Sequence, residues 1–509
     1  MGTRLSRAVG TVFWTTLVGR VLGFLRELLI AQVFGMSAVT DSYVVATTLP
    51  TVLMAVVPGA FNAAAVPLLT RLRGDRAGTR RLFGLLLGWS LPAALLAAVV
   101  GVAAAPAILH LLAPAFPAAT DRIAVPMFRI VTPVLVWVAF LGVAGSVLNA
   151  QGHFLAPSIG PGLASLGVIG AVVFLHGPLG FWCIPLGVAA GYTLQGLAVL
   201  AALLFRGVAP ALSFSTRDPA LRQVGRLLWP MAAGASVGQL GLFVDRIFAS
   251  GLPPGSVSAL NYAGRVLELP LGLFVGAVTV PLLPRLSELA GDVPALRREV
   301  ERFGVYLAAV LLPLSVFLLL AGGPVVAVLF QRGAFLAHDT RVTAFALTFF
   351  ALGLLPMALR DLFARAFYAL GDTATPAWVG AAGVGVNILL DFLLIHPLAQ
   401  GGLALGTAGA AWAGSLVLAG LLYRRVSLGA GGGFGVSLWR LALATGVCAG
   451  VVWAVRPEIL GLPGGLWGWA AQVGLFLLAA LGSFFAAAWL LGVGEVRSAV
   501  RRLGRGGRA

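Results

Sequence analysis

VGTVFWTTLVGRVLGFLRELLIAQVF, residues 9–34, is an apolar stretch that carries only three charged side chains, Arg20, Arg26 and Glu27. As a helix it is long enough to cross a bilayer, which takes about 20 residues. A charged side chain at the bilayer centre costs roughly 2.5–3.5 kcal/mol on insertion scales, so it persists where it lines a polar cavity or pairs with another charge. The stretch therefore predicts a transmembrane helix whose charges do one or the other.

The rest of the chain is built in the same way. Of its 509 residues, 60% are hydrophobic and only 10% are charged. The sequence divides into about fourteen apolar stretches of spanning length. We therefore expect an all-α polytopic membrane protein, with helices near residues 9–34, 42–70, 82–107, 123–149, 156–176, 181–205, 223–250, 257–285, 303–331, 341–370, 376–396, 402–424, 438–456 and 465–493.

Further arginines lie inside these apolar stretches, namely Arg129, Arg246, Arg265, Arg360 and Arg365. A cavity lined by guanidinium groups is cationic and attracts an anion. The pattern indicates a membrane transporter with an anionic substrate. Arg365 is an exception, because Asp361 lies four residues earlier on the same predicted helix and is expected to neutralise it.

The net charge of +17 comes entirely from arginine, because the chain contains no lysine. The arginines gather in alternate loops, as in RLRGDRAGTRR (71–81), and are sparse in the loops between. This is the positive-inside signature, and it predicts an even number of spans with both termini in the cytoplasm. We expect loop 71–81 to set topology and to contact anionic membrane lipids, and we expect no nucleic acid partner.

Two sets of six predicted helices are copies of each other. Three pairs of segments match at offsets of 214 to 219 residues, each at the same place in its set. The pairs are VPLLTRL (66–72) with VPLLPRL (280–286), NAQGHFLAP (149–157) with YALGDTATP (368–376), and AVLAALLFR (198–206) with LVLAGLLYR (416–424). An even number of spans gives both copies the same orientation, so the repeats are parallel and related by an axis along the membrane normal.

The repeat predicts the domain organisation. We expect an N-terminal six-helix lobe at residues 1–206 and a C-terminal six-helix lobe at residues 207–425. Two additional transmembrane helices and a basic tail occupy residues 426–509, outside the repeat. Rocking of two such lobes about a central cavity is the natural transport mechanism of this architecture.

Five segments carry a family resemblance: RVLGFLRELLIAQVFG (20–35), TDSYVVATTLP (40–50), LNAQGHFLAP (148–157), GSVSALNYAGRVLELPLGLF (255–274) and FYALGDTATP (367–376). With them the chain resembles the lipid II flippases (MurJ, also called MviN) over nearly its whole length. These belong to the multidrug/oligosaccharidyl-lipid/polysaccharide exporter (MOP) superfamily, and two extra C-terminal helices are typical of the family.

The resemblance implies a function in peptidoglycan biosynthesis, cell wall biogenesis and cell shape. The substrate would be lipid II, the undecaprenyl-pyrophosphate-linked glycopeptide, moved from the cytoplasmic to the outer leaflet by alternating access. The protein would be a multi-pass component of the bacterial cytoplasmic (inner) membrane. Its partners would be lipid II, membrane lipids and other cell-wall synthesis proteins.

Two rival classes remain. Another exporter of the superfamily, for a polysaccharide-lipid or for drugs, would share the lobes but would not need three arginines in its cavity. A lipid-modifying membrane enzyme would need a clustered acid–base, nucleophilic or metal site. The chain contains no Ser-x-x-Lys, His-x-x-x-x-Asp or His-Glu-x-x-His pattern. We therefore expect no enzyme activity, and no cofactor apart from a coupling ion.

The candidate substrate-binding arginines are Arg20, Arg26 and Arg265, with Glu27 and Glu268 close to them in sequence. The planar guanidinium fork grips phosphate oxygens with paired charge-assisted bonds, which suits a pyrophosphate. Arg265 and Glu268 are at i and i+3 and are placed to pair. The alternative is that each arginine neutralises a glutamate and only joins helices, although two acids cannot neutralise three arginines.

Asp41 is a further candidate for substrate binding or gating. It follows Thr40 at the start of a predicted helix, so a plain N-cap is the alternative. The family usually carries charge near Leu53 and Met54, and an acid where Gly264 stands. This chain departs from the family at those positions, because none of them is charged here.

A candidate cation site consists of Asp245, Asn387, Asp391, the backbone carbonyl of Leu403, and Thr407. All of them offer oxygen atoms, the ligands that hard cations prefer. Asn387 and Asp391 are at i and i+4, hence on one face of a helix. We expect Na⁺ or H⁺ as the coupling ion. The alternative is that Asp245 pairs with Arg246 or another arginine.

Overall fold

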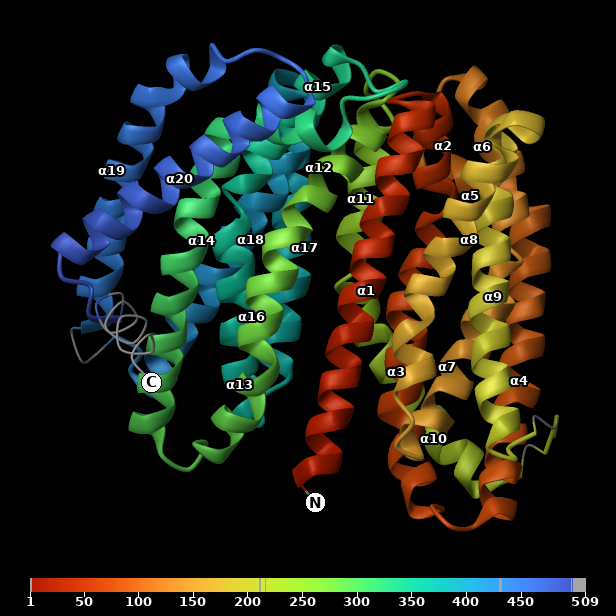
Figure 1. The fold of residues 1–509 in the computed structure, drawn as a ribbon. Helices are drawn as coiled ribbons and strands as arrows, with labels where there is room; N and C mark the ends of the chain where they lie inside the picture. The colour runs from red at the N-terminus through yellow and green to blue at the C-terminus, as the bar shows by residue number, and fades with distance from the viewer. Residues whose placement is uncertain (1, 210–211, 216, 430–432, 496, 498–509) are drawn as a thin grey trace. The chain divides into compact units, whose positions relative to one another are not determined.

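The computed structural model describes residues 2–209, 212–215, 217–429, 433–495 and 497. Throughout this part of the chain the regular structure is helical, and no strand occurs in it (Figure 1). The expected all-α class is therefore confirmed. The chain divides into two compact units, Met1–Ser258 with Gly333–Phe335, and Ala259–Arg332 with Leu336–Ala509.

The first unit contains the helices that precede residue 250. They are α1 (Gly2–Phe34), α2 (Ala38–Ala46), α3 (Thr48–Arg71), α4 (Arg76–Ala103), α5 (Ala105–Leu112), α6 (Ala118–Val131), α7 (Val134–Ala150), α8 (Leu155–Leu179), the 3₁₀ turn η1 (Gly180–Trp182), α9 (Cys183–Phe205), α10 (Pro219–Val237) and α11 (Leu240–Ala249). The next helix, α12 (Ser256–Pro270), begins in this unit and continues into the second.

The second unit contains the helices that follow. They are the π-helical turn η2 (Leu271–Val275), α13 (Gly276–Glu288), α14 (Val293–Phe330), α15 (Ala337–Ala351), α16 (Leu354–Ala369), α17 (Ala374–Leu398), α18 (Gln400–Val426), α19 (Gly433–Leu460) and α20 (Leu466–Leu490). The π turn follows Pro270 directly, and a missing N–H donor is a usual cause of such local rewinding. The helices α19 and α20 pack on each other and on α14 (Figure 1).

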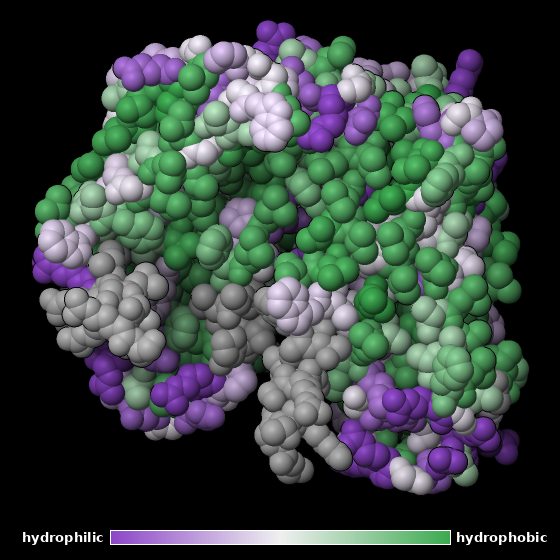
Figure 2. All heavy atoms as spheres, in the orientation of Figure 1, coloured by the Kyte–Doolittle hydropathy of each residue, from purple (hydrophilic) through white to green (hydrophobic). Residues whose placement is uncertain are grey.

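Length and composition make the protein a multi-pass membrane protein. Among the described residues, nine helical segments are long and apolar enough to cross a membrane, or up to eleven if each bent helix pair counts as one span. Figure 2 shows hydrophobic residues over the middle of the visible face of each unit and hydrophilic residues toward the ends. Exposed apolar side chains of this kind suit a lipid environment.

Every helix range predicted from the sequence is helical, but several ranges are broken where one continuous helix was expected. The range 42–70 is split at Thr47, and 123–149 is split at Thr132 and Pro133. At both breaks a threonine hydroxyl donates to the carbonyl four residues earlier, at 2.7 Å from Thr47 and 2.6 Å from Thr132. Such hydroxyl bonds compete with the backbone ladder, and a nearby proline removes a donor from it.

The domain boundaries predicted from the repeat stay predictions. In the structure α10 packs on α3 and contributes Val224 to the core of the first unit. That core also contains Phe61 of α3, Phe83 of α4 and Val147 of α7, all buried.

A seam of small residues joins α8 and α9. A Cβ added to Gly191 would meet the carbonyl oxygen of Ala164, and one added to Gly167 would meet the backbone of Gly191. The two backbones are therefore in direct contact, which small residues permit between membrane helices. Gly170, also on α8, has open space where a Cβ would stand.

Replacing Gly191 by alanine should destabilise the first unit, because the methyl group has no space at the seam. We expect a loss of about 1–3 kcal/mol, the usual cost of overpacking. The measurement is thermal unfolding of the purified protein in detergent. The matched control is Gly170→Ala, which should leave stability unchanged or raise it by up to about 1 kcal/mol through helix propensity. Equal melting of the two variants would contradict the close backbone contact.

Candidate functional site

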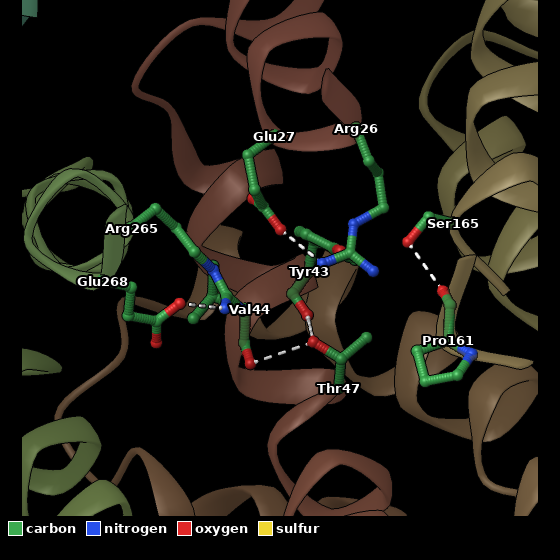
Figure 3. A network of polar contacts seen from close by, with 9 residues as sticks. All are labelled: Arg26, Glu27, Tyr43, Val44, Thr47, Pro161, Ser165, Arg265 and Glu268. Carbon is green, nitrogen blue, oxygen red and sulfur yellow. Dashed lines mark hydrogen bonds and ion pairs between the residues drawn. The ribbon is translucent and has the colours of Figure 1, made fainter. Parts of the chain in front are cut away.

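Arg26 and Glu27 form an ion pair inside the apolar length of α1. Nη2 of Arg26 donates to Oε1 of Glu27 at 2.6 Å, and Glu27 is only 1% exposed (Figure 3). The two residues are adjacent, so their side chains leave the helix about 100° apart. The length of both side chains allows the charged ends to meet across that angle. Arg20 is exposed, and no ion pair to it is seen in the described residues.

Arg265 and Glu268 form the pair that their spacing predicts. Nη1 of Arg265 donates to Oε2 of Glu268 at 2.9 Å on α12, and this prediction is confirmed (Figure 3). The glutamate side chain is 63% exposed and the arginine 33% exposed. An exposed pair of this kind contributes little stability, roughly 0–1 kcal/mol.

Both of these ion pairs lie within one helix, α1 or α12. The alternative, in which each arginine neutralises a glutamate and only joins helices, stays open.

Asp41 is a buried carboxylate with a structural partner far along the chain. The interpretation as the N-cap of its own helix is wrong, because Ser37 caps α2 and Asp41 lies in its first turn. Instead Oδ2 of Asp41 accepts from the backbone N–H of Gly255 at 2.5 Å, and Oδ1 accepts from that of Ser258 at 2.7 Å. These amides are at the start of α12, where the helix itself offers no acceptor. Asp41 therefore caps α12 from α2.

Sequence reasoning missed the partner of Asp41, Ser258. Its hydroxyl donates to the carbonyl of Gly255 at 2.9 Å and lies 3.2 Å from the hydroxyl of Thr40, all within the first unit. The signal in the sequence was weak, since it is only a Gly-Ser-x-Ser run before a helix. Asp41 as a substrate-binding or gating residue stays a prediction.

Four of the candidate cation ligands lie on the packed pair α17 and α18. Nδ2 of Asn387 donates to Oδ1 of Asp391 at 3.2 Å, as their i, i+4 spacing suggests, and both residues are buried. The Asp391 carboxylate lies directly against Gly406 of α18, where a Cβ would collide with it. The next residue, Thr407, donates its hydroxyl to the carbonyl of Leu403 at 3.1 Å.

Asp245 lies on α11, which belongs to the first unit, whereas the other four candidate ligands belong to the second. Its Oδ1 atom is buried, and no hydrogen-bond partner for that atom is found among the described residues. A buried carboxylate oxygen without a hydrogen-bond donor is costly. The alternative, that Asp245 pairs with the neighbouring Arg246 or another arginine, stays open.

Two other intramembrane arginines have local partners. Nε of Arg365 donates to Oδ2 of Asp361 at 3.0 Å, and this predicted pair is confirmed. Nε of Arg129 donates to the carbonyl of Val102 at 3.3 Å, which joins α6 to α4. Both arginines therefore have structural tasks that need no ligand.

Comparison with known proteins identifies the family of the chain. A family model described as lipid II flippase MurJ matches residues 30–461. A probable lipid II flippase MurJ of Synechocystis sp. is 30% identical over 475 residues, which cover 88% of this chain and 87% of that protein. The lipid II flippase MurJ of Burkholderia cenocepacia is 32% identical over 438 residues, covering 81% and 83%.

Solved structures share the fold. A lipid II flippase MurJ in an inward closed conformation superposes with a TM-score of 0.79 at 22% identity, covering 93% of this chain and 97% of that one. An inward-facing multidrug resistance MATE family transporter of the MOP superfamily gives a TM-score of 0.69 at 12% identity, covering 82% and 98%. Since the family model and two curated relatives span most of its length, this chain belongs to the lipid II flippase MurJ family.

Proposed function

We propose that this protein moves lipid II from the cytoplasmic to the outer leaflet by alternating access, with Arg20, Arg26 and Arg265 holding the pyrophosphate. The observation that carries the proposal is the excess of guanidinium over carboxylate in apolar helices of a MurJ family member. A pyrophosphate supplies the missing negative charge and accepts several N–H bonds at once. Glu27 and Glu268 would then orient the arginines, and Asp41 would hold the start of α12.

Alternating access is supported by solved structures of the same fold. MATE family transporters of the MOP superfamily are known in an inward-facing and in an outward-facing conformation, with TM-scores of 0.69 and 0.58 to this chain. We propose the same alternation here, in the bacterial inner membrane with both termini in the cytoplasm. The arginine-rich alternate loops support that orientation. Other cell-wall synthesis proteins are the partners we would expect to supply and to consume lipid II.

Alanine at Arg20, Arg26 or Arg265 should abolish complementation of a flippase-depleted bacterium while the protein still inserts into the membrane. Each charged hydrogen bond lost from a buried phosphate is worth about 1.5–3 kcal/mol, so lipid II binding should weaken at least about tenfold. Lysine should restore little, because an ammonium cannot form the bidentate contact.

The matched control is Arg129→Ala, which removes an intramembrane arginine outside the proposed site. It should complement normally at equal membrane abundance. The readouts are growth and leaflet-resolved lipid II movement in proteoliposomes. Normal growth with all three candidate arginines replaced would refute the pyrophosphate site.

We further propose that Asp245, Asn387, Asp391, the carbonyl of Leu403 and Thr407 bind Na⁺, or that the carboxylates bind H⁺, as the coupling ion. The buried carboxylate of Asp391 and the buried Oδ1 atom of Asp245 support this proposal. A cation that binds one conformation more tightly shifts the population toward it by its difference in affinity. The ion would thus drive the return to the inward-open state.

Thermal stability against Na⁺, K⁺ and pH tests this site. Na⁺ should stabilise the folded wild type by about 2.7 kcal/mol at one hundred times the dissociation constant, and the melting temperature should rise with the logarithm of the Na⁺ concentration. The variant Asp391→Asn should lose the stabilisation by Na⁺ and keep lipid II binding. The variant Asp361→Asn, which removes a carboxylate elsewhere in the second unit, should keep the stabilisation by Na⁺. Identical curves for wild type and Asp391→Asn under all conditions would remove the ion from the mechanism.

A further inference from the structure

A pocket of about 420 Å³ opens in the first unit, away from the candidate site residues. Its walls come from the turn between α3 and α4, from Gln151 after α7, and from the end of α9. Four arginines line it, with Asp75 as the acid among its lining residues; the arginines are Arg73, Arg76, Arg80 and Arg206. The positive-inside rule assigns this end of the unit to the cytoplasm.

Two of the four arginines hold the walls of the pocket together. Nε and Nη2 of Arg73 donate to the carbonyl of Ala150 at 3.2 and 2.6 Å, which satisfies the last carbonyl of α7. Nη2 of Arg80 donates to the carbonyl of Gly207 at 2.8 Å. These partners are neutral carbonyls, so the bonds fix the side chains and leave their positive charge uncompensated.

The remaining two arginines, Arg76 and Arg206, are exposed at the pocket. Within the described residues neither side chain has a hydrogen bond or an ion pair, although the backbone N–H of Arg206 donates to the carbonyl of Leu203. The acid Asp75 is already engaged, because its Oδ1 accepts from the N–H of Gly78 at 2.9 Å as the N-cap of α4. The pocket therefore presents guanidinium donors that no carboxylate of its lining satisfies.

The matching end of the second repeat is neutralised. Residues 71–81 contain five arginines and one acid, whereas residues 285–302, which begin at the matching Arg285, contain four arginines and four acids. In the second repeat Arg285 lies 3.5 Å from Glu288, and Arg297 lies 3.8 Å from Glu301. In the first repeat Arg81 lies 2.8 Å from Asp218, but none of the four arginines that line the pocket has a carboxylate partner among the described residues.

A single exchange accounts for part of this difference. The counterpart of Arg206 in the second repeat is Arg424. Nη1 of the next residue, Arg425, donates to Oδ2 of Asp372 at 2.7 Å. The segment match places His153 where Asp372 stands. Burial, then Arg206 and Arg73, lower the pKa of His153, which favours the neutral ring, and an imidazole cannot supply the negative charge that a carboxylate would. Hydrogen bonds from the Thr375 backbone and hydroxyl, and then Arg425, lower the pKa of Asp372, which keeps it anionic.

An apolar surface adjoins the pocket. Phe205, which lines it, is 90% exposed, and the preceding Leu204 is 53% exposed. At the end of a membrane helix such side chains lie among acyl chains. The ligand chemistry that fits is therefore a phosphate with an apolar tail beside it.

We propose that this pocket binds the phosphate of an acidic phospholipid headgroup, with Arg76 and Arg206 as its ligands and Phe205 against an acyl chain. A phosphodiester carries one negative charge, and the two guanidinium forks can take its free oxygens with charge-assisted bonds. Arg73 and Arg80 keep their hydrogen bonds to the backbone carbonyls and contribute positive electrostatic potential to the pocket. The site is separate from the proposed transport site, and its test does not require transport.

Titration of the purified full-length protein with short-chain phosphatidylglycerol, followed by calorimetry, tests the proposal. The double variant Arg76→Gln/Arg206→Gln should bind at least about tenfold more weakly, since two charged bonds of about 1.5–3 kcal/mol each are lost. His153→Asp should weaken binding similarly while keeping every arginine, because it supplies the acid that the second repeat has. The matched control is Arg71→Gln, an exposed arginine of the same loop outside the pocket, which should bind like the wild type.

Two further arms separate the ligand sources and report on the site itself. Inorganic phosphate and short-chain phosphatidylcholine should bind much more weakly than phosphatidylglycerol; equally tight, competing inorganic phosphate would overturn the lipid assignment. In NMR spectra of histidine-labelled protein, phosphatidylglycerol should raise the pKa of His153 in the wild type and not in the double variant. Wild-type affinity in the double variant, with normal melting, would refute the site.

Discussion

Hydrocarbon provides no partner for a charge or for a backbone amide, and the structure of this protein depends on that constraint. Every helix must satisfy its own backbone, and every charge inside an apolar stretch must find a counter-charge, a carbonyl or water. Arg26 uses the adjacent Glu27, Arg365 uses Asp361, and Arg129 uses a backbone carbonyl of α4. In the transport site proposed above, the pyrophosphate of lipid II would supply further counter-charge to the arginines.

The same constraint applies at helix ends. The first N–H groups of a helix have no acceptor within it. Ser37 serves α2 and Asp75 serves α4 from their own N-caps, but α12 uses Asp41 of α2. A carboxylate that caps a distant helix ties the start of that helix to α2. Such a cap can be made or lost as a unit, whereas a local cap moves with its helix.

Much of this fold was accessible from the sequence, because hydropathy and repeated segments are local signals. Helix ranges, the Arg265–Glu268 pair and the Asp361–Arg365 pair follow from spacing alone. The contact of Asp41 with Gly255 spans 214 residues and has no periodic signal, so it could not be predicted. The pairing of Arg26 with Glu27 fits the alternative that each arginine neutralises a glutamate, but spacing does not predict it, because residues at i and i+1 do not share a helix face. The breaks at Thr47 and Thr132 accompany hydrogen bonds from their hydroxyls to backbone carbonyls, and composition does not predict where such bonds form.

The seam between α8 and α9 has a consequence for motion. Where Gly167 and Gly191 bring two backbones into contact, neither helix can slide past the other without a collision of main-chain atoms. We therefore expect the pair to move as one body. Deformation within this unit must concentrate where the helices are already interrupted, at Thr47 and at Thr132 with Pro133. The pair would then act as a lever and the interruptions as its hinges, so that a small local change in backbone torsion becomes a large displacement at the helix ends.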